Sequence, residues 1–254
     1  LRGAATVSIR LVSKNLFGPG WWLPSTCEVA LPAGLTVRSG ARLAHADGDG
    51  RLDLLIDVEG GAHPKGAVAV ALGNGDGTFH PPEVDERFLV LASEGWLLAG
   101  DDPDTLGVWP LAADDLNGDG VADFVSPHGV FMASPTPPHN LTRTYATTEP
   151  WVGAATVDVD GDGGRDVAAF SRESPRLDVL RCGELCGSEG RFHWSPYDLE
   201  HPATMVRSGR LRGNGFDDLV LLSRGPEGDA ISVMAGVAND WPLMPRKQAA
   251  FHRV

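Results

Sequence analysis

The 254-residue sequence predicts an all-β fold made of repeated four-stranded sheets. A loop rich in acidic residues and glycine recurs four times, each time between short apolar segments typical of β-strands. An aromatic residue followed within two positions by proline marks a second place in the repeat. The last three loops begin 43 and 52 residues apart, which fits four strands of about five residues with short turns. No stretch keeps a 3.6-residue apolar period, so we expect few helices.

The recurring loop has the chemistry of a calcium site. Its fullest copy, DVDGDGGRD at residues 158–166, places carboxylates at positions 1, 3, 5 and 9 around the pivot Gly163. A tight turn with an acid at every second position points oxygens inward, and calcium takes six to eight oxygen ligands at about 2.3–2.6 Å. The last acid falls at position 9, whereas an EF-hand needs a glutamate at position 12. The sequence therefore predicts a calcium loop that joins two strands.

The chain opens with two predicted strands and no loop of this kind before them, so residues 1–34 should form half of a sheet. The first full unit, about 35–91, carries HADGDGRLD at 45–53, with His45 at position 1. We expect this loop to bind calcium more weakly or through a water. The later Asn-Gly-Asp-Gly at 74–77 lacks an acid at the required offset and predicts a hairpin turn. An insertion, about 92–107, follows this unit.

Three more units follow, at about 108–150, 151–202 and 203–254, and we expect residues 1–254 to form a single domain. The loop of the second unit, DLNGDGVAD at 115–123, has asparagine at position 3, which still offers a carbonyl oxygen. The loop of the fourth unit, RLRGNGFDD at 210–218, has arginine at positions 1 and 3. Arginine side chains should replace the metal there.

Composition limits the classes of partner. The net charge is -13 and the few lysines and arginines form no run, so we expect no nucleic-acid ligand. No apolar stretch reaches 18 residues, so no membrane-spanning helix is predicted. Cys182 and Cys186 could form a disulfide across a hairpin tip in an oxidising compartment, although two free thiols or half of a zinc site fit the same spacing. The start at Leu1, without a methionine or leader pattern, suggests part of a longer chain or of an assembly.

The loops at 115–123 and 158–166, together with ALGNGDGTF at 71–79, resemble the FG-GAP/VCBS repeats of integrin-α-like β-propellers. The resemblance covers about residues 35–245. It implies a propeller of four-stranded blades in which each calcium loop joins the first two strands of a blade. It also implies Ca²⁺ bound by side chains at positions 1, 3, 5 and 9 and the carbonyl at position 7.

Carried onto this chain, the resemblance implies two calcium sites and a third in the first loop. The implied ligands are Asp115, Asn117, Asp119, Asp123 and the carbonyl of Val121; Asp158, Asp160, Asp162, Asp166 and the carbonyl of Gly164; and Asp47, Asp49, Asp53 and the carbonyl of Arg51. Propellers of that family usually have seven blades, and this chain supplies four units and a half. A missing upstream portion, a smaller ring or a partner chain would explain the difference.

The function that these features favour is an extracellular or cell-surface recognition or adhesion module, non-catalytic, which binds protein or glycan. Most of the seven tryptophans, Trp151 and Trp194 among them, fall at repeat positions that predict packing between blades, whereas Trp21 and Trp96 are freer to stack on a sugar. The alternative is a carbohydrate-active enzyme, a polysaccharide lyase or hydrolase. Its best candidates are His193 and Tyr197, which alternating spacing could place on one strand face as acid and base. No catalytic motif supports it.

Overall fold

The computed structural model describes residues 5–14, 22–86, 110–136, 140–172, 174–182, 192–211, 217–226, 228–236 and 249–252. Every named secondary-structure element is a β-strand. The chain divides into two compact units, Leu1–Trp109 and Pro110–Val254. The expectation of a single domain stays a prediction, and the insertion expected at 92–107 lies outside the described residues.

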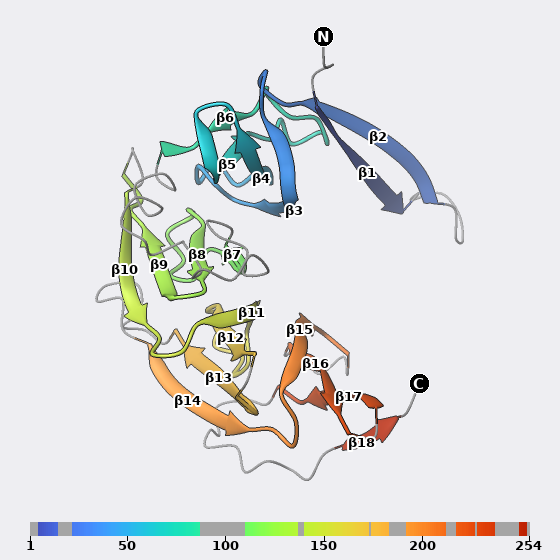
Figure 1. The fold of residues 1–254 in the computed structure, drawn as a ribbon, viewed down its shortest axis with the longest axis vertical. Helices are drawn as coiled ribbons and strands as arrows, with labels where there is room; N and C mark the ends of the chain where they lie inside the picture. The colour runs from blue at the N-terminus through green and yellow to red at the C-terminus, as the bar shows by residue number, and fades with distance from the viewer. Residues whose placement is uncertain are drawn as a thin grey trace. The chain divides into compact units, whose positions relative to one another are not determined.

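The first unit contains the predicted half-blade and one blade (Figure 1). The half-blade is an antiparallel pair whose partners run from Thr6 with Ala30 to Lys14 with Trp22. A core cluster joins Val29 and Leu31, from this pair and its exit, to Ile56 in the middle of the four-stranded sheet. The strands are β1 (Thr6–Lys14) and β2 (Trp22–Ala30), then β3 (Thr36–Ala44), β4 (Asp53–Gly60), β5 (His63–Ala71) and β6 (Glu83–Val84).

The second unit contains three four-stranded antiparallel sheets, each with its strands in chain order (Figure 1). They coincide with the repeats predicted at 108–150, 151–202 and 203–254. The strands are β7 (Ala112–Asp114), β8 (Asp123–Ser126), β9 (Gly129–Ala133) and β10 (Leu141–Ala146); β11 (Trp151–Val157), β12 (Asp166–Ser171), β13 (Arg176–Arg181) and β14 (His193–Asp198); and β15 (Ala203–Gly209), β16 (Asp218–Gly225), β17 (Gly228–Met234) and β18 (Ala249–His252).

The middle sheet of the second unit is buried on both faces. Successive side chains of a strand point to opposite faces of the sheet. On β12, Val167 and Ala169 therefore point to one face, and Ala168 and Phe170 point to the other. The first pair packs in a cluster with residues of β7–β10, and the second in a cluster with residues of β15 and β16. A Cβ at Gly153 would lie 2.4 Å from the Phe170 ring, so glycine there lets strand and ring approach. Sheets stacked in this way are the blades of an all-β, β-propeller fold.

An aromatic pair joins the first two blades of the second unit. Trp151, at the start of β11, is 1% exposed. Its ring stacks on Tyr145 of β10, with centroids 5.8 Å apart and planes 5° from parallel. The prediction that Trp151 packs between blades is confirmed.

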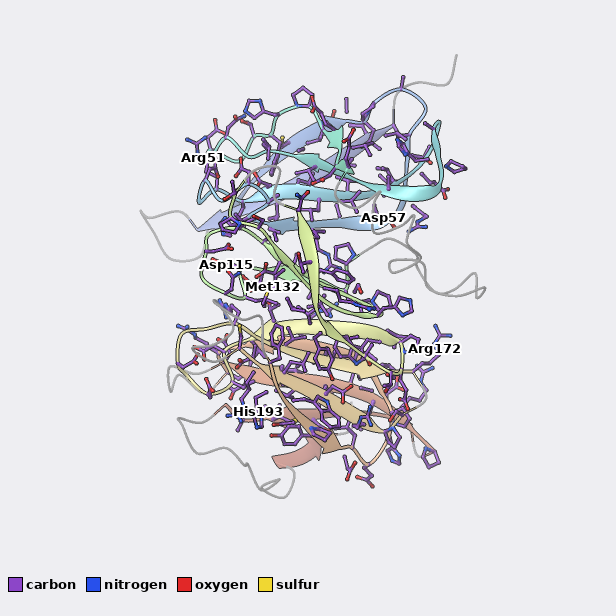
Figure 2. All side chains as sticks on the ribbon, turned by 90° about the vertical axis from the view of Figure 1, so that its left-hand side faces the viewer. Arg51, Asp57, Asp115, Met132, Arg172 and His193 are labelled. Carbon is purple, nitrogen blue, oxygen red and sulfur yellow. The ribbon has the colours of Figure 1, made fainter. Side chains whose placement is uncertain are left out.

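A buried ion pair in the first unit was not predicted. Asp57 on β4 is fully buried and lies 3.1–3.2 Å from two guanidinium nitrogens of Arg38 on β3 (Asp57 is labelled in Figure 2). The two residues are 19 positions apart and lie on either side of the loop at 45–53, so the sequence pattern gives no sign that they face each other. The pair offsets the desolvation of a carboxylate inside the sheet.

The turn at 74–77 is a hairpin turn, as predicted. Gly75 and Gly77 have φ of 82° and 90°, a conformation that glycine adopts without strain. The amide of Asn74 donates to the carbonyl of Thr78 at 2.9 Å, and Gly73 forms a β-bridge with Phe79.

Removing apolar volume between two blades should destabilise the second unit. Leu180 is fully buried in the cluster between the β7–β10 and β11–β14 sheets. We expect Leu180→Ala to lower the free energy of unfolding by about 2–5 kcal/mol, measured by denaturant titration. Ile231→Ala removes a similar side chain from β17 that is 38% exposed, and it serves as the control. Equal losses from the two substitutions would contradict this packing.

Candidate metal sites

The four acidic loops lie where the sequence predicts them, each between the first and second strands of its sheet. In the second unit, Asp115 lies at this loop end, whereas Arg172, just after β12, lies at the opposite end (Figure 2). All residues of the first three loops are described, but 212–216 of the fourth are not.

Loops one to three share one backbone frame. The side-chain oxygen at position 3 accepts the amide hydrogen of position 5, and the carboxylate at position 5 accepts that of position 7. The distances are 3.1 and 2.7 Å in loop one, 3.0 and 2.9 Å in loop two, and 3.3 and 2.7 Å in loop three. Glycines at positions 4 and 6 have φ between 75° and 89° in all three loops. These turns hold the side chains at positions 3 and 5 in the same way in each loop.

The aspartate at position 9 accepts hydrogen bonds that were not predicted. It is at most 1% exposed in every loop. One of its oxygens accepts the amide hydrogen of position 2, and the other accepts an amide hydrogen just beyond the third strand or at its end. The bonds are Ala46 and Gly73 to Asp53 (2.6 and 2.8 Å), Leu116 and Ala133 to Asp123 (2.9 and 2.8 Å), Val159 and Cys182 to Asp166 (3.0 and 2.9 Å), and Leu211 and Gly236 to Asp218 (3.0 and 3.1 Å).

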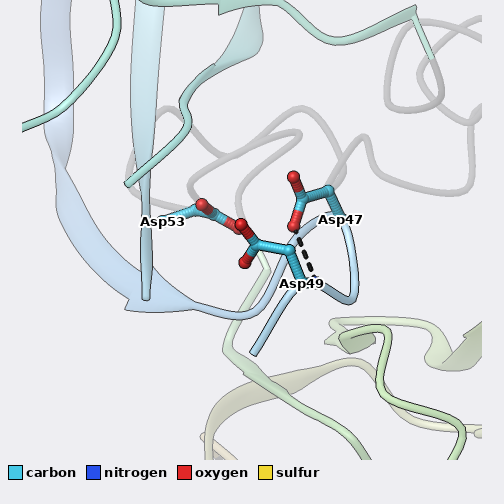
Figure 3. A group of neighbouring side chains, drawn as sticks. All are labelled: Asp47, Asp49 and Asp53. Carbon is cyan, nitrogen blue, oxygen red and sulfur yellow. Dashed lines mark hydrogen bonds between the residues drawn. The ribbon is translucent and has the colours of Figure 1, made fainter. Parts of the chain in front are cut away.

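Three carboxylates converge in loops one and three. Ligand oxygens of Asp47, Asp49 and Asp53 lie within 4.8 Å of one another, as do those of the loop-three residues at positions 1, 3 and 9. Figure 3 shows the loop-one group, with the Asp49 amide bonded to Asp47. Like charges so close repel, and a divalent cation relieves that repulsion. An oxygen-only donor set of this kind suits calcium better than a transition metal.

Loop two is arranged differently. Asp115 turns one oxygen to the amides of Gly118 and Asp119, at 2.7 and 3.1 Å, and the other to that of Gly120 at 2.9 Å. The Asn117 side-chain amide donates to Asp119 at 3.1 Å. The predicted ligands are thus at the loop, and Asp115 already accepts three backbone amide hydrogens, whereas its counterpart Asp158 in loop three accepts one. Val121 contributes its amide hydrogen to the shared frame.

In loop one, His45 takes the place of the first acid. Its Nδ1 lies 2.8 Å from the carbonyl oxygen of Arg51, the predicted position-7 ligand. A carbonyl can only accept, so Nδ1 carries the hydrogen in this contact. The imidazole uses one lone pair of that oxygen, which gives a physical reason for the expected weaker binding.

In loop four, arginine side chains hold the carboxylate, in line with the prediction that cations replace the metal. Asp217 lies 3.2 Å from Nε of Arg210 and 2.8 Å from Nη1 of Arg165, which comes from loop three. Burial opposes ionisation of Asp217, but the Asp158 amide and the two guanidinium groups outweigh it and lower its pKa. The sequence pointed to Arg210 but not to Arg165.

Two of the position-9 carboxyls have strongly raised pKa values in the metal-free chain. Burial raises the pKa of Asp123 and of Asp166 to about 7, although two backbone hydrogen bonds lower each. The neighbouring acids of each loop add repulsion. Burial and nearby carboxylates also raise the pKa of Asp53 and Asp160.

Cys182 is disulfide-bonded, while Cys27 has a free thiol. The Cys182 amide donates to Asp166, and its sulfur lies 2.9 Å from the carbonyl oxygen of Leu116 in loop two. Its predicted partner, Cys186, lies outside the described residues. Cys182 therefore has two roles. It forms the disulfide, and its amide binds the position-9 aspartate Asp166 just after β13.

His193 and Tyr197 both lie on β14, but their surroundings differ. His193 is exposed, and its Nδ1 lies 3.2 Å from Arg181 and 3.3 Å from Ser195. Tyr197 packs against the core cluster of the third and fourth blades, and burial raises its pKa to about 12. A phenol with that pKa is a poor general base at neutral pH.

Comparisons with known proteins leave the family open. No family model matches the sequence, and no curated protein matches it. One similar solved structure is described as "Crystal structure of BBS1N in complex with ARL6DN, soaked with lead". The two chains are 10% identical with a TM-score of 0.43, over 95% of this chain and 62% of that chain, so this chain spans less than two thirds of the other's length. Among the described residues, no helix is long and apolar enough to cross a membrane.

The position-9 bond should stabilise the chain whether or not metal is present. Asp218 tests this, because arginines replace the acids at positions 1 and 3 of its loop. Asp218→Ala removes the acceptor of two amides, and we expect it to lower the free energy of unfolding by about 2 kcal/mol or more, equally in calcium and in EDTA. Asp229→Ala, at an exposed ion pair with Arg224, should change it little. A loss seen only in calcium would show that Asp218 acts through a metal.

Stability without metal should fall as pH rises from about 4 to 7. Asp123 and Asp166 have folded-state pKa values of about 7, above the ordinary 3.8, so the folded state binds more protons than the unfolded state in this window. Their stabilising contribution is complete below pH 4 and is lost through pH 7. Calcium requires ionised ligands, so its stabilising effect should grow over the same window. Thermal unfolding in EDTA and in calcium at several pH values measures both, and a flat EDTA profile would contradict the prediction.

Proposed function

We propose that this chain is a non-catalytic recognition or adhesion module of the extracellular space or cell surface, built of FG-GAP/VCBS-like repeats. Its blades present a surface for protein or glycan, and calcium orders their loops. The observation that carries the proposal is the convergence of three carboxylates within 4.8 Å in loops one and three, on the shared backbone frame. The disulfide at Cys182 supports an oxidising compartment.

The loops differ in what they would offer a metal. In loop three, Asp158, Asp160 and Asp166 supply the converging oxygens, while Asp162 and the carbonyl of Gly164 complete the predicted set. Each Asp166 oxygen accepts one amide hydrogen and keeps a second lone pair. Loop one offers Asp47, Asp49 and Asp53, with the Arg51 carbonyl shared with His45. In loop two, Oδ1 of Asp115 accepts two backbone amides and Oδ2 accepts one, so Oδ2 keeps a lone pair for a metal.

The expected energetic effect is modest. Extracellular calcium is millimolar, and a concentration tenfold above the dissociation constant stabilises the folded state by roughly 1.4 kcal/mol per site. That is enough to order an acidic loop whose carboxylates otherwise repel. Calcium in such a site has a structural role, and the ligand would bind elsewhere on the blades.

The alternative, a polysaccharide lyase or hydrolase, rests on His193 and Tyr197. The raised pKa of Tyr197 counts against a base at that position. Polysaccharide treated with the chain would gain unsaturated ends that absorb in the ultraviolet if lyase chemistry occurred. Binding of the polysaccharide with no formation of unsaturated ends would support the recognition module.

Removal of calcium should lower the thermal midpoint. We expect EDTA to reduce it by a few degrees relative to millimolar calcium, because each site contributes about 1 kcal/mol. The Asp160→Ala, Asp162→Ala double variant should lose part of that response, since both side chains belong to loop three. Differential scanning calorimetry measures the shift.

The matched control is Asp76→Ala, which removes an acid from the glycine-rich turn at 74–77. That turn lacks the later acid, so the variant should keep the full calcium response. If EDTA leaves the wild-type midpoint unchanged, the loops are turns without metal, and the calcium proposal is wrong.

A further inference from the structure

A buried carboxylate organises a cluster between the outer strands of two blades, apart from the acidic loops. Asp178, on β13, is 3% exposed. One oxygen accepts the indole hydrogen of Trp151 at 2.9 Å, and the other that of Trp194 at 3.1 Å. Nε of Arg176 lies 2.9 Å from the same oxygen as Trp194. Three donors converge on this carboxylate and offset its desolvation.

The two tryptophans bound to Asp178 differ in exposure. Trp151 is 1% exposed, whereas Trp194, on β14, is 43% exposed. The prediction that Trp194 is covered by packing between blades is therefore not met. Its N–H edge is fixed inside the cluster while much of its ring faces solvent. A large aromatic side chain that is already immobile loses little conformational entropy when a ligand binds it.

Arg176 places a positive charge beside this ring. Its guanidinium carbon lies 5.7 Å from the Trp194 ring centroid, and its side chain is 29% exposed. Nε is used by Asp178, and no other described residue pairs with the two terminal nitrogens. These nitrogens can donate two parallel hydrogen bonds to a carboxylate.

Tyr145 extends the cluster across the blade boundary. It lies on β10, the fourth strand of the preceding blade, and stacks on Trp151 (Figure 1 shows the strands). Burial and the Asp178 carboxylate raise its pKa, and Arg176 lowers it, so the Tyr145 hydroxyl lies within the electrostatic reach of both residues. Phe192 meets the Tyr145 ring edge-on at 6.5 Å and supports it.

We propose that Trp194, Arg176 and Tyr145 form a binding site for a sugar that carries a carboxylate, such as a hexuronic acid. The pyranose ring stacks on the exposed indole, and its carboxylate binds the terminal nitrogens of Arg176. This inference rests on the glycan branch of the proposed function.

The site favours a uronic acid over an acidic peptide because the sugar has a flat C–H face and a carboxylate on one ring. An acidic peptide side chain would engage Arg176 and leave the indole uncovered.

Calorimetric titration of the whole chain with trigalacturonate, and with its neutral methyl ester, tests the site. We expect Trp194→Ala to weaken trigalacturonate binding by about tenfold or more, through loss of stacking. Arg176→Gln should remove the preference for the acid over the ester, because the neutral glutamine side chain does not attract a carboxylate as the guanidinium does. Met205→Ala changes an exposed side chain on β15 that belongs to neither this cluster nor the acidic loops, and it should bind as the wild type does.

The outcomes separate this site from the proposed function. The calcium-dependent thermal midpoint of each variant shows whether it folds, and Trp194→Phe keeps a ring if the alanine variant fails to fold. Wild-type binding that survives in Trp194→Ala, no binding of trigalacturonate by the wild type, or tighter binding of a hexaglutamate peptide would each overturn the site. The calcium response would stand in all three cases, so the module proposal would fall only with that response.

Discussion

The blades depend on one buried contact, the position-9 aspartate that accepts amide hydrogens from two separate segments of its sheet. A β-hairpin fixes the register of two strands, but it does not fix where a long loop lies against a third strand. In each repeat one carboxylate binds the start of the loop and the end of the third strand. Because the group is almost completely buried and both oxygens are used, moving either segment would leave a polar group unpaired.

Most of the fold could be predicted from the sequence, because loop spacing and strand alternation are local. The strand pairs on either side of 45–53, 115–123 and 158–166 follow directly from apolar segments next to acidic turns. The hydrogen bonds that Asp53 and Asp218 accept could not be predicted, since a metal ligand and a hydrogen-bond acceptor look the same in a sequence. Their one signal was that position 9 stays acidic in loop four, where positions 1 and 3 are arginine.

The candidate sites were predictable in composition but not in geometry. Asp115 in loop two accepts three backbone amide hydrogens and its counterpart Asp158 in loop three accepts one, although the two loop sequences are similar. The ion pair between Arg165 and Asp217 was missed because the two residues are far apart in sequence and meet only when two loops become neighbours. The cluster around Asp178 could not be predicted either, since a single acid between apolar strand residues matches no recognisable motif.

The arginine cluster around Asp217 has a consequence for how the chain is made. A guanidinium is part of the polypeptide and is present from synthesis, whereas a divalent ion must be captured from the surroundings. Two of the donors to Asp217, Arg165 and the amide of Asp158, belong to loop three, so this contact holds the third acidic loop against the fourth blade before any ion binds. The junction between the third and fourth blades is therefore closed by cations of the polypeptide itself, and calcium bound by loops one and three as proposed would add to an already ordered contact.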